Sequence, residues 1–260
     1  MLAIITAAIF SLLSFILPRT AASIYSLIML PLILFVGFIL GLQVASTYEK
    51  DLKKSFLFLS LFLIIYMLIN IDALWPPLYS VLGRSLIFLV LFLQVVNYAM
   101  LIVSCIYTLR VMEARRMHKY GWVIFGMLFD ICVYIVFYGI PAMMGGIPAN
   151  PAVAVSSMMI RIFDMSIVLM LVPVLVLYLQ NSRSKAQESV TFTLIMCGII
   201  ISLLSTYIIE FATGMPPYKA AEAGLLNPPY LFGYIIIAIG LYAHRKYDEW
   251  GYKMIEKALG

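Results

Sequence analysis

Apolar residues in this chain gather in long runs and do not alternate with polar ones. Eight runs lie at 2–17, 24–46, 55–72, 85–109, 122–140, 157–180, 189–212 and 229–244. A helix that crosses a bilayer needs about 20 mostly apolar residues. The pattern therefore predicts eight transmembrane helices, or seven if the short first run does not span.

The connections between the runs are short, which predicts one all-α polytopic bundle over residues 1–246. Residues 247–260 form a separate tail with an amphipathic pattern. Its aromatic and apolar positions recur at helical spacing, with Lys and Glu on the opposite face. This pattern predicts a short helix that lies in the cytoplasmic membrane interface. A helix that docks a partner protein is the alternative.

The composition supports a membrane environment. Of the 260 residues, 64% are hydrophobic and 11% are charged, and the mean hydropathy is +1.06. Soluble domains average about 45–50% apolar and about 25% charged residues. The net charge of +5 does not indicate nucleic-acid binding, because the basic residues form no stripe interleaved with aromatic residues.

Basic residues are distributed unequally between the two sets of connections. The connections after the second, fourth and sixth runs, together with the tail, hold 13 of the 17 Lys and Arg residues. Positive charge marks the cytoplasmic side of a membrane protein. We therefore expect a multi-pass plasma-membrane protein with a cytoplasmic C-terminus. The N-terminus is cytoplasmic too if the first run spans, and lies outside if it does not.

Several polar residues lie inside the predicted spans or at their ends. They are Asp72, Gln94, Asn97, Asp130, Arg161, Asp164 and Glu210. An unpaired charge at membrane depth costs at least about 2.5–3.5 kcal/mol. These side chains should therefore face the bundle interior and find partners. Arg161 is expected to pair with Asp164, three residues away on the same helix face, or with Asp130.

Two interpretations of these polar residues remain open. In the first, one carboxylate neutralises Arg161, while Gln94 and Asn97 form hydrogen bonds across helices and fix their packing. In the second, the carboxylates line an outward-facing cavity that binds a cation, a proton or the polar head of a small ligand such as a quinone. The surplus of acidic residues keeps the second interpretation open, because four carboxylates accompany one arginine at these depths.

The sequence predicts no bound cofactor, although a membrane protein of this kind could bind a lipid or a quinone. Cys105, Cys132 and Cys197 are far apart in the sequence, which argues against a disulfide framework or a cysteine metal site. His118 and His244 come at cytoplasmic helix ends and are predicted to be interface residues, not haem ligands. Nucleotide-binding, hydrolase and metalloprotease motifs are absent from the sequence, so we expect no enzyme activity.

Three functions fit these features. The leading hypothesis is a non-catalytic subunit that anchors or scaffolds partners in a larger membrane complex, in one version a respiratory or quinone-reactive complex. Its partners would be lipids and other membrane subunits. The alternatives are a small secondary transporter or channel with an outward-facing acidic site, and a membrane sensor that signals through a separate protein. A sensor should have an outward pocket and a closed inner face, whereas a transporter needs a path to both faces.

Overall fold

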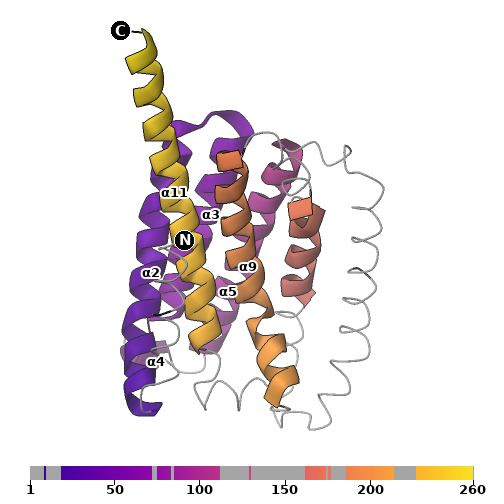
Figure 1. Cartoon of the computed structure of the whole chain (residues 1–260). Helices are drawn as coiled ribbons and strands as arrows, with labels where there is room; N and C mark the ends of the chain where they lie inside the picture. The colour runs from indigo at the N-terminus through magenta and orange to yellow at the C-terminus, as the bar shows by residue number, and fades with distance from the viewer. Residues whose placement is uncertain are drawn as a thin grey trace.

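The computed structural model describes residues 9, 19–71, 75–82, 85–111, 129, 162–173, 175–176, 186–213 and 227–259. These residues are helical almost throughout, and no strand occurs among them, which confirms the predicted all-α class. The helices are α2 (Arg19–Thr47), α3 (Lys50–Ile69), α4 (Trp75–Leu82), α5 (Ser85–Val111), α9 (Ala186–Thr213) and α11 (Asn227–Leu259) (Figure 1). A further helical segment covers Ile162–Pro173.

Three stretches have the length and hydropathy of membrane spans. They are Ile28–Thr47, Lys50–Ile69 and Phe88–Arg110, with mean hydropathies of 2.5, 2.0 and 2.3. The Ile162–Pro173 and Thr191–Ser205 stretches are apolar but shorter. The chain is thus a helical protein suited to a membrane, while the predicted total of eight spans is not confirmed. Except for Ile9 and Phe129, the predicted runs at 2–17 and 122–140 lie outside the described residues.

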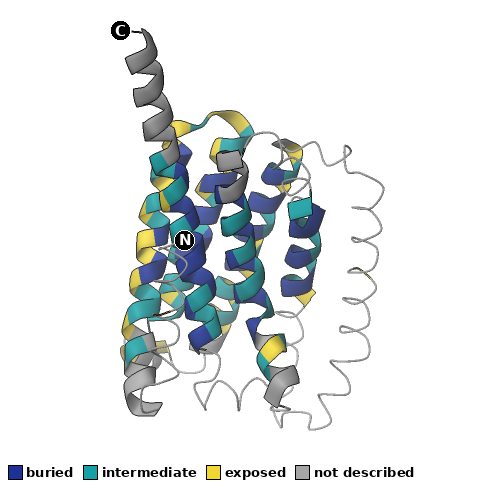
Figure 2. Cartoon of the chain, viewed as in Figure 1, coloured by how far each residue is buried: buried dark blue, intermediate teal, exposed yellow. Residues whose placement is uncertain are grey.

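The outer surface of the bundle is apolar, as a lipid-facing surface should be. Phe88 and Phe92, about one turn apart on α5, are exposed, and Phe88 has 74% of its surface accessible. Exposed side chains of α2 include Ile28, Leu32 and Phe35. Soluble monomers rarely expose large contiguous apolar patches. In Figure 2, exposed positions lie on the outer sides of the helices, and buried positions face the neighbouring helices.

The helices run antiparallel to their neighbours in sequence. Helix α3 packs against both α2 and α5, and α11 packs against α9 and α2 (Figure 1). Six basic residues therefore lie near one end of the bundle, where α2 ends and α3 begins: Lys50, Lys53, Lys54, Arg110, Arg245 and Lys246. We call this the basic end, and that it faces the cytoplasm stays a prediction. Arg19 begins α2 at the opposite end.

Helix α11 is longer than the predicted last span. It is a single helix from Asn227 to Leu259, so the predicted span and the predicted tail belong to one continuous element. Its C-terminal part extends beyond the other helices at the basic end (Figure 1). Contact of this part with a membrane interface stays a prediction.

Glycines let α9 and α11 approach until their backbones touch. A Cβ atom added at Gly198 would lie 2.7 Å from the carbonyl oxygen of Gly233, and one added at Gly233 would lie 2.9 Å from the carbonyl oxygen of Gly198. Two turns further along α11, a Cβ atom at Gly240 would meet the backbone nitrogen of Ile195 at 3.1 Å. Small residues at such crossings are typical of membrane helices, because packing drives their association.

Helices α3 and α5 are joined by a cluster of hydroxyl groups. The Ser55 and Ser104 hydroxyls each donate to the other residue's carbonyl oxygen, at 3.1 and 2.9 Å. The Ser55 hydroxyl also lies 2.6 Å from the Thr108 hydroxyl. All three residues are buried, so their hydrogen bonds take the place of lost contacts with water.

We expect Ser55→Ala to lower the free energy of unfolding by about 0.6 kcal/mol and by no more than about 1.7 kcal/mol, the range found for hydrogen bonds between membrane helices. The loss is small because Ser104 can still donate to the carbonyl oxygen of residue 55. Thermal unfolding in detergent measures it. Ser46→Ala is the control, since the exposed Ser46 hydroxyl bonds only within α2, to the carbonyl of Gln43. Equal unfolding temperatures for the two variants would contradict the prediction.

Candidate functional site

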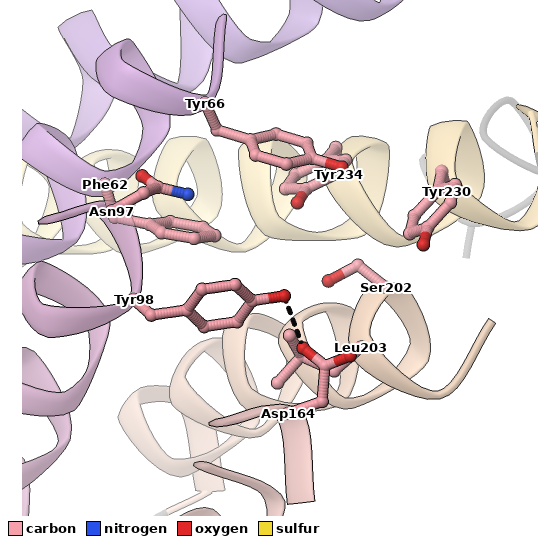
Figure 3. A pocket seen from close by; sticks show the side chains of 9 residues that line it. All are labelled: Phe62, Tyr66, Asn97, Tyr98, Asp164, Ser202, Leu203, Tyr230 and Tyr234. Carbon is pink, nitrogen blue, oxygen red and sulfur yellow. Dashed lines mark hydrogen bonds between the residues drawn. The ribbon is translucent and has the colours of Figure 1, made fainter. Parts of the chain in front are cut away.

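Five helical segments converge on a polar cavity of about 30 Å³ (Figure 3). They are α3, α5, the Ile162–Pro173 segment, α9 and α11. The described side chains that line the cavity are mostly aromatic or polar, and they are Phe62, Tyr66, Asn97, Tyr98, Asp164, Ser202, Leu203, Tyr230 and Tyr234. Among these nine residues, Asp164 is the only acidic one and none is basic.

Asp164 is the acidic residue of the cavity wall. Its residue is only 5% exposed, and its Oδ1 accepts a hydrogen bond of 2.6 Å from the Tyr98 hydroxyl. The Tyr98 ring also stacks on Phe163, with 5.5 Å between ring centroids. Two contacts therefore attach the Ile162–Pro173 segment to α5 and hold the carboxylate at the cavity wall (Figure 3).

Asn97 contributes a buried amide to the same wall. The residue is 2% exposed, and its Oδ1 has no hydrogen-bond partner among the described residues. Leaving a buried acceptor unsatisfied costs about 1–3 kcal/mol. The packing interpretation expects Asn97 to form a hydrogen bond across helices. Its Oδ1 atom forms no such bond among the described residues.

Four tyrosines complete the cavity. The rings of Tyr66 and Tyr234 lie 5.2 Å apart, centroid to centroid, and Tyr230 lies one turn before Tyr234 on α11 (Figure 3). Sequence reasoning missed these tyrosines and Ser202. The available signal was that all five lie inside predicted apolar runs, where a hydroxyl group needs a partner.

The cavity extends from the middle of the bundle toward the end opposite the basic end. Asn97 is twelve residues into α5, about 18 Å along that helix. Tyr230 is three residues into α11, about 5 Å along it, and α11 begins at the end opposite the basic end (Figure 1). If the basic end is cytoplasmic, the cavity lies in the outer half of the membrane.

The structure brings together two of the residues singled out in the sequence, Asp164 and Asn97. Gln94 lies on α5 but is not among the residues that line the cavity. Glu210 belongs to α9, and its side chain is outside the described part. Asp72, Asp130 and Arg161 are outside the described residues, so the expected pairing of Arg161 with Asp164 or Asp130 stays a prediction.

A second polar cluster surrounds His244 near the basic end. His244 is fully buried, with its Nε2 atom 2.5 Å from the Tyr48 hydroxyl and its Nδ1 atom 2.7 Å from the Thr191 hydroxyl. The ring of Phe192 meets the imidazole edge-on at 4.9 Å between centroids, and Phe56 lies on another side at 5.6 Å. Beside this cluster, Arg245 donates a hydrogen bond to Gln43 of α2.

The burial of His244 corrects the prediction that it is an interface residue. Its position near the end of an apolar run suggested contact with headgroups. In the structure, Tyr48 in the short α2–α3 connection and the first apolar turns of α9 cover the imidazole. His118 lies outside the described residues.

An apolar layer separates the two polar clusters. Along α11, His244 is ten residues after Tyr234, about 15 Å further along the axis. Ile237 and Leu241, which lie between them, are buried in the main core. In the described part of the chain, buried apolar residues and then the His244 cluster thus lie between the cavity and the basic end.

The described residues contain no cluster of three or more His, Cys, Asp or Glu that could hold a metal ion. Cys105 and Cys197 are not in disulfides, and Cys132 lies outside the described residues. Comparisons of the chain with family models, with curated proteins and with solved structures found no match.

Proposed function

We propose that this chain is a small membrane transporter or channel, and that the species it moves is a small cation or a proton that binds beside Asp164. The observation that carries the proposal is a nearly fully buried carboxylate on the wall of a polar cavity between five helical segments. An ionisable group at membrane depth is costly to insert. Such groups usually mark ion pathways or proton relays.

The polar wall supports a binding role more than a packing role. A cluster that only fixes packing should satisfy its buried donors and acceptors and leave no space. Here the Asn97 Oδ1 atom has no partner among the described residues, and about 30 Å³ of space remains. A carboxylate, an amide and hydroxyl groups around such a space can bind a small polar species.

The size of the cavity argues against a quinone. One water molecule needs at least about 10–15 Å³ of space measured in this way. A cavity of about 30 Å³ therefore has room for about two water molecules. A quinone ring is several times larger, and it would have to displace Tyr98 or Tyr234.

A cavity that reaches toward one end only is compatible with transport. Alternating access opens a site near the middle of the membrane to one side at a time. The core layer and the His244 cluster would form the closed side in this state. A sensor shares the pocket and the closed end, so ion movement is the property that separates the two proposals. The subunit hypothesis stays a prediction, which co-purification of partners would support.

Flux through proteoliposomes tests the proposal. We expect purified protein to carry current when a gradient of protons or of a small monovalent cation is imposed, measured on a solid-supported membrane. Asp164→Asn keeps the shape of the side chain but removes its charge, and it should reduce the current at least tenfold. The matched control is Asp51→Asn, the same change at a partly exposed residue that pairs with Lys54 near the basic end.

The control should carry the current of the unaltered protein. Absence of current under every gradient, in protein that remains folded and inserted, would refute the transport proposal. So would a current that Asp164→Asn leaves unchanged.

A further inference from the structure

We propose that the basic end binds the headgroup of an anionic phospholipid where α3 meets α5, with the lipid phosphate between the Lys54 ammonium group and the Arg110 guanidinium group. This inference does not depend on the transport proposal. Three features support it: the depth of the two cations, the aromatic ring that both of them contact, and the exposed apolar surface beside them.

Lys54 and Arg110 lie at the depth of lipid headgroups. Two of the stretches suited to span a membrane are Lys50–Ile69 and Phe88–Arg110, so Lys54 is about one turn into one span and Arg110 ends the other. The Ser55 hydroxyl lies 2.6 Å from the Thr108 hydroxyl, which puts the two helix ends at the same level. Because headgroups border the hydrocarbon core at the ends of the spans, both cations can reach a lipid phosphate.

One aromatic ring holds the two cations near each other. The Lys54 Nζ atom lies 5.3 Å from the centroid of the Tyr107 ring, and the Arg110 Cζ atom lies 5.5 Å from the same centroid. The Phe58 ring stacks on Tyr107, with 5.9 Å between centroids. Arginine binds phosphate oxygens through two hydrogen bonds, and lysine binds them as a point charge. A phosphate beside the ring can therefore contact both side chains.

The first turn of α3 adds positive charge to this site. Lys50 and Lys53 lie in the same turn as Lys54, and the acidic residues there are Glu49 and Asp51. The Lys54 Nζ atom is 3.9 Å from the Asp51 carboxylate, and both side chains are exposed; such pairs contribute little. Positive charge at a helix N-terminus is unfavourable because the helix dipole is positive there. A bound phosphate would compensate this repulsion.

Exposed apolar side chains continue from the site toward the middle of the membrane. Leu57 is three residues after Lys54 on α3, and Ile106 is four residues before Arg110 on α5. Residues at these spacings lie on the same face of a helix, and Leu57 and Ile106 are 39% and 37% exposed. A lipid whose phosphate contacts the two cations can lay an acyl chain along this surface. A soluble acidic partner would leave the surface uncovered, so a phospholipid fits the site better.

Native mass spectrometry of the purified full chain in detergent tests the site. We titrate phosphatidylglycerol and phosphatidylcholine with the same acyl chains, because the two lipids differ in headgroup charge. Each basic residue near an anionic lipid strengthens binding about fivefold. For the first lipid bound, we therefore expect an apparent affinity for phosphatidylglycerol at least about tenfold above that for phosphatidylcholine. Salt should reduce this preference, because it screens exposed charges.

Single substitutions assign the preference to the two cations. Lys54→Gln and Arg110→Gln should each lower the affinity for phosphatidylglycerol about fivefold and change that for phosphatidylcholine by less than about twofold. Both residues are exposed, so the variants should fold, and thermal unfolding without lipid checks this. Lys246→Gln is the matched control. It removes one positive charge at the same end, but on α11, which packs against α2 and α9.

Three results would overturn the inference. They are equal affinities for the two lipids, a preference that neither Lys54→Gln nor Arg110→Gln reduces, and a preference that Lys246→Gln reduces as much as they do. Glycerol phosphate, which has no acyl chains, should not displace the lipid at equal concentration. Displacement would show that a soluble phosphate is sufficient and would overturn the assignment to a lipid. None of these measurements involves ion movement, so the transport proposal is judged separately.

Discussion

Gly233→Ala is expected to destabilise the bundle by about 2–3 kcal/mol, although alanine is a better helix former than glycine by about 1 kcal/mol. The added Cβ atom would lie 2.9 Å from both the carbonyl oxygen of Gly198 and the backbone nitrogen of Ser202. Backbone atoms cannot move aside as a flexible side chain can, so α9 and α11 must separate. Overpacking of this kind typically costs about 1–3 kcal/mol and sometimes more.

Gly37→Ala is the matched control for this substitution. It makes the same change in the interior of α2, but the new Cβ atom would meet only the end of the Leu63 side chain, at 3.1 Å. A small rotation of that side chain relieves the contact, so Gly37→Ala should be neutral or stabilise by up to about 1 kcal/mol. Thermal unfolding of both variants measures the difference. Equal unfolding temperatures would show that the glycine contact between α9 and α11 is not required.

The helices were the predictable part of this fold. Each described long helix, from α2 to α11, contains all or most of one of the apolar runs seen in the sequence. Length and hydropathy suffice for this, because a bilayer requires backbone hydrogen bonds to be satisfied within each span. The continuity of α11 through Leu259 was not predictable, since a charged segment can either continue a helix or bend into the interface.

The rotation of each helix was not predictable. Apolar residues face both the lipid and the core, so hydropathy does not tell which face of a span is inside. Asp164 and Asn97 were found in the sequence because polar groups at depth must face inward. The tyrosines of the cavity were missed because a tyrosine can equally face the headgroups. The contact between Tyr48 and His244 joins positions 196 residues apart, so no local sequence pattern predicts it.

His244→Ala is expected to lower the free energy of unfolding by about 3–5 kcal/mol, the cost of truncating a large buried ring. The variant leaves a cavity among Phe56, Phe192 and Tyr48, which now contact the imidazole ring. It also removes one hydrogen bond from each of two hydroxyl groups, those of Tyr48 and Thr191. Tyr48→Phe removes one of these hydrogen bonds without leaving a cavity, so it should cost only about 1 kcal/mol.

Tyr242→Ala is the control for His244→Ala, because it truncates a ring two residues away on the same helix. Tyr242 is 52% exposed, so its truncation opens no enclosed cavity and should cost well under half as much. Thermal unfolding in detergent, followed by tryptophan fluorescence, compares the three variants. If His244→Ala unfolds at the temperature of Tyr242→Ala, the His244 cluster does not hold α2, α9 and α11 together.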